Sequence, residues 1–579
     1  MVRLLSLLVA FTLVGLAGCT QDEKTALRNE VARELIARRS DLTVADPQGQ
    51  ITRGSVTGQA TAKGYDHPDQ YLAEFATKIA QNMEPVMIHE GEIAQTAQKL
   101  AALEKKTGRK PNIMIFLMDD VGWMDPGFNG GGIALGNATP TMNELAHGGL
   151  VLTSAYSTPS CTPTRATIHT GQNPLHHGLL RPPMYGEAGG LDGTMTFPKV
   201  LQKQGYITQG VGKWHMGENE GSLPQNVGYD DYYGFLGVSD MYTEWRDQYY
   251  NREVALSPKR YALLEIMPFD HYNTHCTSDD KKKCKDEYQI NLTTITELDQ
   301  DWAAYSENFI QEMEGNDKPF FLYHATRGCH FDNYPNDEYA GKSHARTVFS
   351  DCMVEVDDIL KRLVNALKET NQLENTLIFL TSDNGPECEI PPHGRTPFRG
   401  CKGSSWEGGV RVPTFAYWPG MIKPGRSDGL FDLADLFHTA ISLTGIKGAD
   451  IGGLVSSDHY LDGVDQLSFL LGDNHLSNRY SRIYTMNQFP SAVRIDEFKG
   501  SSVVELEQGI FQRGYTGGFS GAVVPNTGGV VVTNLYTNPQ EDTSIGIRHI
   551  PMGVLLGAEA KRYNEVLEKF PIDIKVGFQ

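Results

Sequence analysis

The sequence predicts an α/β fold, in which a large, mainly parallel mixed sheet is sandwiched by helices and a smaller C-terminal α+β domain follows. Short apolar runs alternate with helix-length segments from residue 112 onward. The apolar runs lack the strict alternation of a strand with one wet face, so helices should cover both faces of the sheet. After about residue 475 the texture changes to short strand-like pieces that follow one another before a final amphipathic helix.

The helices of the large domain show the apolar spacing of one buried face. After Ser343, the residues Cys352, Val356 and Leu360 recur at helical intervals. Helices are expected over 142–147, 197–204, 293–313, 343–370 and 430–443. The expected strands are NIMIFLM (112–118), LVLTSAY (150–156), YITQGVG (206–212), PFFLYHA (319–325), NTLIFLT (375–381) and VPTFAYW (412–418).

The first eighteen residues have the form of a secretory signal peptide. Arg3 precedes an apolar run over residues 4–18 that is too short to span a bilayer. The tetrapeptide LAGC resembles the lipobox of bacterial lipoproteins, which implies cleavage before Cys19 and lipidation of its thiol. An ordinary signal peptide with an incidental cysteine is the alternative. Either form predicts export, and the lipobox predicts a lipoprotein anchored in a membrane facing the periplasm or at the cell surface.

The remaining chain divides by composition into three parts. Residues 19–110 are polar and read as a tether with surface helices at 68–83 and 91–106. Residues 111–475 form the predicted catalytic domain, and 476–579 the small C-terminal domain. In the C-terminal domain we expect strands within 481–487, 491–498 and 529–536 and a final helix over 560–570.

The net charge of −20 argues against a nucleic-acid partner, because such proteins need a basic face to displace counterions from phosphate. An anionic substrate must therefore meet a local group of cations or a metal ion.

Cysteine counting sets one thiol apart. Removing Cys19 from the eight cysteines leaves seven, which is an odd number for an exported chain. Cys161 is the one we leave unpaired. The other six permit three disulfides in fifteen pairings, and Cys276 with Cys284, around a short lysine-rich loop, is the simplest pair.

Acidic residues end two of the expected core strands. Asp119 and Asp120 follow the first strand, and Asp383 and Asn384 follow another. Strand ends of one such sheet converge at one edge, where ligands collect. Carboxylates about 4 Å apart repel by roughly 4 kcal/mol at an effective dielectric of 20, so the group calls for a cation. Oxygen ligands favour Ca²⁺ or Mg²⁺ over zinc.

The stretch SCTPTRATIHTG places Cys161 just ahead of a predicted helix, with Pro163 near its first position. The free N–H groups of a helix start and the charge of Arg165 favour an anion there.

The C-x-P-x-R core of this stretch, followed by Thr170 and Gly171, resembles that of the type I sulfatases in the alkaline-phosphatase-like superfamily. The resemblance covers roughly residues 111–450, with a weaker echo in NLYTNPQED near the C-terminus. It implies that a maturation enzyme oxidises Cys161 to formylglycine. It also implies that Ca²⁺, with Mg²⁺ as the lesser candidate, is bound by an oxygen of modified Cys161 and by Asp119, Asp120, Asp383 and Asn384.

The same resemblance assigns roles to further residues. Lys213 and Lys402 would hold the sulfate group, and His215 would deprotonate the formylglycine hydrate. An extended backbone would send Lys213 and His215 to the same side. His330 would protonate the leaving alcohol, although the family commonly has proline where this chain has Cys329. The competitor for that role is His324, whose place inside a strand predicts packing.

Arg399, Glu407 and Arg411 flank the Lys402 segment, and we expect them to have structural roles.

The predicted activity is hydrolysis of an aryl sulfate or sulfated carbohydrate through a formylglycine hydrate nucleophile. Two alternatives stay open at this point. One is a phosphomonoesterase or phosphonate hydrolase of the same superfamily, and the other is a non-catalytic lipoprotein that captures sulfated glycans and leaves Cys161 unmodified. Tyrosines and Trp245 between residues 241 and 284 offer an aromatic surface for substrate rings, without naming a glycan.

Overall fold

The structure is a computed structural model in which the chain divides into two units, Met1–Asp69 and Gln70–Gln579. The residues it describes all belong to the second unit. They are 76–183, 187–237, 246–248, 251–264, 271–388, 391–505, 523–525, 530–542 and 548–577. The predicted signal peptide, Cys19 and most of the aromatic segment 241–250 lie outside the described residues.

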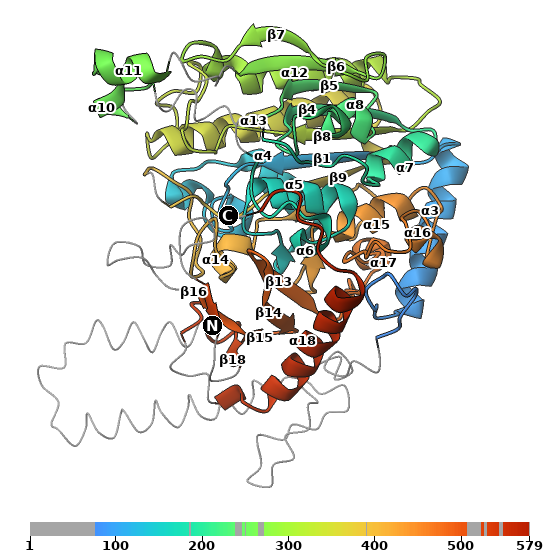
Figure 1. Ribbon diagram of the computed structural model, residues 1–579. Helices are drawn as coiled ribbons and strands as arrows, with labels where there is room; N and C mark the ends of the chain where they lie inside the picture. The colour runs from blue at the N-terminus through green and yellow to red at the C-terminus, as the bar shows by residue number, and fades with distance from the viewer. Residues whose placement is uncertain are drawn as a thin grey trace, which may run out of the picture. The chain divides into compact units, whose positions relative to one another are not determined.

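A ten-stranded mixed sheet forms the centre of the second unit (Figure 1). Its five middle strands, β9, β1, β8, β4 and β5, run parallel, whereas β10, β6 and β7 are antiparallel to their neighbours. The prediction of a mainly parallel mixed sheet is therefore confirmed. In spatial order the strands are β11 (Gly425–Ser427), β2 (Leu150–Leu152), β10 (Phe415–Tyr417), β9 (Thr376–Ser382), β1 (Asn112–Met118), β8 (Phe320–Ala325), β4 (Ile207–Lys213), β5 (Asp231–Phe235), β6 (Tyr272–Thr277) and β7 (Lys285–Gln289).

Helices cover both faces of this sheet (Figure 1). All seven residues of β1 are buried, and alternate side chains enter two different cores. Ile113, Ile115 and Leu117 pack with α5 (Cys161–Thr170), α7 (Phe197–Lys203) and α15 (Asp435–Ser442). The intervening methionines and Phe116 pack with α4 (Pro140–Gly148), α12 (Leu298–Glu312) and α13 (Val348–Glu369). Burial on both faces explains the continuous apolar runs.

Some predicted boundaries shift for local reasons. The run 150–156 forms two short strands, β2 and β3 (Ala155–Tyr156), in different sheets. The helix expected from residue 343 begins at Val348, because the Thr347 hydroxyl accepts the Ser350 N–H and caps it. A helix over 68–83 is wrong for its described part, since Thr77 bridges to Val86 instead. The helix expected at 91–106 is present as α3 (Glu90–Thr107).

The C-terminal part carries its own antiparallel sheet, which confirms the predicted α+β texture. Four strands pair in the order β13 (Arg482–Met486), β14 (Phe489–Ile495), β15 (Phe498–Ser501) and β18 (Val531–Asn534). Helix α18 (Met552–Lys569) packs along β14 and β15 (Figure 1). Two further short strands, β16 (Val503–Glu505) and β17 (Val523–Pro525), form a separate pair.

Glu407 joins the C-terminal sheet to β3 of the large domain. Its buried carboxylate accepts hydrogen bonds from Tyr156 (2.7 Å) and Tyr484 (2.6 Å), and the Lys499 ammonium lies 3.4 Å away. Arg411 lies 3.6 Å from the same carboxylate. Removing one partner of such a buried pair is strongly destabilising, so these contacts support the expected structural role of Glu407 and Arg411.

The cysteines form two disulfides among the described residues. Cys276–Cys284 joins β6 to the start of β7, as predicted, and Cys388–Cys401 is a second bridge. A third bridge does not form, which corrects the expectation that all six cysteines pair. Cys329 and Cys352 are buried free thiols, and the Cys329 Sγ packs 3.3 Å from the sulfur of Met353. In this apolar core a reduced thiol serves as a small hydrophobic side chain.

Within the described part of the chain, none of the helices combines the length and apolar character needed to cross a bilayer.

Candidate active site

The residues expected to carry chemistry converge at the carboxyl ends of the parallel strands. Asp119 and Asp120 follow β1, and Asp383 and Asn384 follow β9. The backbone N–H of Asp120 bonds to Asp383 Oδ1 at 3.3 Å, which brings the two pairs together. Lys213 ends β4, which lies next to β8 and two strands from β1. Parallel strands thus deliver segments far apart in the chain to one rim.

Cys161 is the first residue of α5 and points into this group. Its Sγ lies 3.7 Å from Asp119 Oδ1 and 3.8 Å from Lys213 Nζ, and the residue is 1% exposed. Burial and the nearby Asp383 raise the thiol pKa well above its usual range. Cys161 is therefore a neutral thiol in this structure, which makes it a poor nucleophile in its own right.

Three carboxylates are matched by three cations. Lys213 Nζ donates to Asp119 Oδ2 at 2.6 Å, and Lys402 Nζ donates to Asp120 Oδ2 at 2.8 Å. Arg165 donates two hydrogen bonds, of 3.0 and 2.8 Å, to Asp383 Oδ2. Its third bond, of 2.7 Å, goes to the carbonyl of Lys213 and fixes the guanidinium below the site. The acidic chain thus supplies the local cations that an anionic substrate requires.

The carboxylates remain unequal despite this pairing. Burial opposes ionisation of Asp119, but the charges of Lys213 and Arg165 outweigh it and hold the pKa well below its usual range. Burial raises the pKa of Asp120 to about 6. Burial and the charge of Asp119 raise the pKa of Asp383 to about 7. Two of the three carboxylates thus lack sufficient positive charge from the protein alone.

The donor set fits a divalent cation. Asp119, Asp120, Cys161 and His330 each offer a ligand atom, and these atoms lie within 4.8 Å of one another. In the described residues this is the one such group. The side-chain oxygen of Asn384 is buried without a hydrogen-bond partner among the described residues, while its amide donates to Asp120 at 2.6 Å. A buried oxygen without a hydrogen-bond partner, beside carboxylates that lack matching positive charge, is a favourable environment for a hard cation.

Lys402 and His330 form the side of the site nearest solvent. Lys402 Nζ lies 3.1 Å from His330 Nε2, and His330 Nε2 lies 3.7 Å from Asp120 Oδ2. Burial, with the charges of Lys213 and Lys402, lowers the pKa of His330 well below its usual range. Burial opposes the charge on Lys402, but Asp120 outweighs it and raises the pKa well above the usual range. The lysine therefore stays cationic and donates to a neutral imidazole.

His215 lies beyond the end of β4, with a left-handed φ of 57°, so the extended backbone expected through it is wrong. The Thr162 hydroxyl donates to its carbonyl at 2.6 Å and ties this turn to α5. Both ring nitrogens are buried without a hydrogen-bond partner among the described residues. Burial, then Lys213 and Arg165, lowers the pKa of the ring well below its usual range, which leaves a neutral base near these charged groups.

His324 belongs to the packed core, as its strand position predicts. It bonds to the Ser306 hydroxyl at 2.8 Å and stacks on Phe116 with ring centroids 5.2 Å apart. Burial lowers its pKa to about 3.

Asp125 connects two loops next to the site, and the sequence did not predict this role. It accepts the N–H groups of Gly122 at 2.7 Å and Arg395 at 2.8 Å, and so joins two loops that border the site. Burial raises its pKa to about 8. The only signal was an acid before Pro126, which is typical of any turn.

Comparison with known proteins identifies the family of the chain. The family model described as Sulfatase matches residues 111–446, which is more than half of the chain and includes every residue of the cluster. The chain belongs to the sulfatase family. It is accordingly a sulfuric ester hydrolase, and a second sulfatase model, described as the putative sulfatase AslA C-terminal domain, matches residues 491–568.

The sulfatase is similar to two curated sulfatases and to one sulfatase of known structure. It is 30% identical over 421 residues to the N-acetylgalactosamine-6-sulfatase of Canis lupus familiaris, covering 69% of this chain and 74% of that protein. It is 32% identical over 398 residues to the arylsulfatase A of Bos taurus, covering 66% and 72%. The crystal structure of PsFucS1 sulfatase from Pseudoalteromonas sp. superposes with a TM-score of 0.80 at 36% identity, covering 86% of this chain and 99% of that one.

Proposed function

We propose that this sulfatase hydrolyses a sulfate monoester of a phenol or carbohydrate, using formylglycine made from Cys161 and one bound Ca²⁺. The observation that supports the proposal is the position of the Cys161 Sγ, between Asp119 Oδ1 and Lys213 Nζ at 3.7 and 3.8 Å. A side chain at this point touches both the candidate metal ligands and the cations.

The ligands in this proposal are Asp119, Asp120, Asp383 and Asn384, with an oxygen of the modified residue 161. Their donors are oxygen atoms, which suits Ca²⁺ and, less well, Mg²⁺. When bound, the ion supplies positive charge that lowers the pKa of a nearby hydroxyl and polarises the sulfate, and formylglycine supplies the nucleophilic oxygen.

The protein's own residues bind the anion and move the protons. Lys213 and Lys402 hold the sulfate oxygens, since each ammonium is fixed by a buried carboxylate at 2.6 or 2.8 Å and needs no rearrangement. Arg165 pairs with Asp383 and so offsets negative charge in the site. His215, a buried neutral ring, accepts a proton at the side of Cys161. A substrate oxyanion beside Lys402 raises the pKa of His330, so that the ring takes up a proton from solvent and then donates it to the departing oxygen.

The choice between sulfate and phosphate esters rests on charge and metal count. A sulfate monoester carries one negative charge, whereas a phosphate monoester carries up to two. Enzymes that cleave phosphate monoesters therefore commonly bind two metal ions. The test is to compare turnover of 4-nitrophenyl sulfate and 4-nitrophenyl phosphate by enzyme purified from its native host. We expect the sulfate to be cleaved at least about 100-fold faster. Faster cleavage of the phosphate would overturn the proposal.

His330→Ala tests the proposed proton donor. We expect kcat/KM for an alkyl or sugar sulfate to fall about 100-fold or more, because an alkoxide leaves poorly without a proton. For 4-nitrophenyl sulfate, whose phenolate leaves unaided, the loss should stay below about tenfold. His324→Gln is the matched control, since it alters packing and should leave the ratio of the two substrates unchanged. Equal losses with both substrates in His330→Ala would remove its assignment as the acid.

We further propose that residues 1–18 are a signal peptide, that Cys19 is lipidated, and that the catalytic and C-terminal domains meet near residue 475. The support is the lipobox-like LAGC and the change of texture after 475.

In the native host, Cys19→Ala should lose incorporation of a labelled fatty acid and leave the membrane fraction, whereas Cys352→Ala should retain both. Unlabelled wild-type protein would contradict the anchor.

A further inference from the structure

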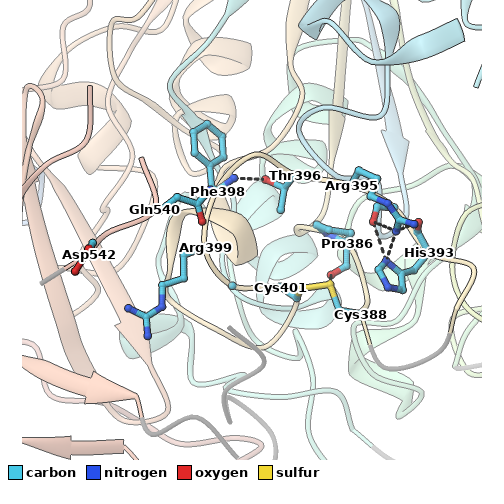
Figure 2. Close-up of a pocket in the computed structure, with 12 residues that line it drawn as sticks. Pro386, Cys388, His393, Arg395, Thr396, Phe398, Arg399, Cys401, Gln540 and Asp542 are labelled. Carbon is cyan, nitrogen blue, oxygen red and sulfur yellow. Dashed lines mark hydrogen bonds between the residues drawn. A yellow bond between two sulfur atoms is a disulfide. The ribbon is translucent and has the colours of Figure 1, made fainter. Parts of the chain in front are cut away.

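A second cavity lies beside Lys402 and has no role in the chemistry above. It has a volume of about 570 Å³, which is within the range of small-ligand sites. The Cys388–Cys401 disulfide, Pro386 and Phe398 contribute to its lining, and Figure 2 shows Arg399 on one side of the disulfide with Arg395 and His393 on the other. Gln540 and Asp542 reach it from the C-terminal part of the chain.

The cavity adjoins the open side of the active site. Cys401 immediately precedes Lys402, and the Lys402 N–H bonds to the carbonyl of Pro386 at 3.0 Å. Lys402 is 7% exposed, whereas Asp119 and Asp383 are fully buried, so substrate reaches the site from the Lys402 side. The backbone of Cys401 and Lys402 thus lies between the cavity and the active site.

Arg395 is held rigidly at the edge of this cavity. Its N–H bonds to Asp125 Oδ1 at 2.8 Å and its carbonyl accepts the Met124 N–H at 3.2 Å. Both partners belong to the loop after Asp119 and Asp120. The side chain is exposed, and its Nη1 atom bonds to His393 Nδ1 at 2.8 Å and to nearby carbonyls. The hydrogen bonds that the Arg395 side chain makes to described residues all come from Nη1.

The charge of the cavity differs from that of the whole chain. The lining includes two guanidinium groups, Arg395 and Arg399, and one carboxylate, Asp542, in a protein of net charge −20. Arg399 also stacks on Trp406, with its guanidinium carbon 4.0 Å from the ring centroid. Guanidinium groups bind tetrahedral oxyanions through paired N–H donors, and the half-buried Phe398 offers an apolar wall to the C–H face of a sugar.

From the juxtaposition of this cationic cavity with Lys402, we propose that it binds a second sulfate group of a multiply sulfated saccharide while the first is positioned for hydrolysis. The proposal rests on the proposed sulfatase activity for the position of the first sulfate, and it assigns the substrate class as a saccharide with at least two sulfate groups. Arg395 is the principal contact, with Arg399 opposite.

The test uses sucrose octasulfate, a disaccharide whose sulfates point in all directions, as an inhibitor of 4-nitrophenyl sulfate hydrolysis. Arg395→Gln should raise its inhibition constant about tenfold relative to the KM of the small substrate, because one charge-assisted contact is lost. Arg395→Lys should lose less, since it keeps the charge without the paired donors. Arg109→Gln makes the same change at the amino end of β1, where Arg109 bonds to the Asn316 carbonyl, and should alter neither value.

An unchanged inhibition constant in Arg395→Gln, or an equal rise in KM for 4-nitrophenyl sulfate, would overturn the second-sulfate site. If the wild-type protein hydrolyses neither an aryl sulfate nor a sulfated saccharide, the proposed function fails separately. Calorimetric titration of sucrose octasulfate into the same variants then decides the cavity alone: a tenfold weaker affinity in Arg395→Gln supports it, and equal affinities overturn it.

Discussion

Replacing Cys161 by alanine abolishes sulfate ester hydrolysis, with kcat reduced by at least about 10⁴-fold, the scale on which enzymes lose activity without their nucleophile. The reason is the position of this side chain, which alone in the cluster begins a helix and contacts both Asp119 and Lys213. Loss of one sulfur atom from a residue that is 1% exposed leaves a small cavity and should cost no more than a few kcal/mol of stability. Steady-state hydrolysis of 4-nitrophenyl sulfate measures the loss, and circular dichroism shows that the variant is folded.

Cys352→Ala is the matched control for this experiment, because Cys352 is another buried free thiol but lies in α13 within the apolar core. It should lower stability while retaining activity within about threefold. Mass spectrometry of the peptide that contains residues 160–165, taken from enzyme expressed in the native host, should show an aldehyde at 161 in place of the thiol. A fully active enzyme with an intact Cys161 thiol would contradict formylglycine chemistry.

Calcium added to metal-free protein should stabilise it and restore activity. At a free concentration 100 times Kd, binding to the folded state alone adds about 2.7 kcal/mol to the free energy of unfolding. The physical cause is the cluster in which burial raises the pKa values of Asp120 and Asp383 to about 6 and about 7, so that added positive charge is favourable. Thermal unfolding with and without Ca²⁺, after removal of metal with a chelator, measures the effect independently of turnover.

Asp120→Asn should lose most of the calcium-dependent shift, since it removes one ligand charge and the partner of Lys402. The matched control is Asp317→Asn, an exposed acid that precedes β8 at its amino end, away from the cluster. It should retain the full shift. If calcium leaves the unfolding temperature of the wild-type protein unchanged, the cluster does not bind this ion.

Several features could be predicted from local patterns because their causes are local. The buried strands of the large sheet read as apolar runs, and α13 as a helical repeat, since burial dictates residue type along each element. The Cys276–Cys284 bridge needed only a short loop. The sulfatase motif around Cys161 and the acids after β1 and β9 were also visible in the sequence.

Other features depend on contacts between distant segments, and no local pattern contains them. That Cys329 stays reduced depends on its burial against the sulfur of Met353, 24 residues away in the chain. The role of Asp125 depends on Arg395, which lies 270 residues away in the chain and donates its backbone N–H to the Asp125 carboxylate. The left-handed turn at His215 is tied by Thr162, from another helix.

By itself, the sequence determined the fold class, the family and the residue types that meet at the strand ends, because these follow from hydrophobic periodicity and short motifs. Only the tertiary structure decided which cation pairs with which carboxylate, which cysteines stay reduced, and that Arg395 and Arg399 border a cavity beside Lys402. Those outcomes depend on distances of a few ångströms between segments that strand order brings together, and Coulomb energy and hydrogen bonding change steeply over such distances.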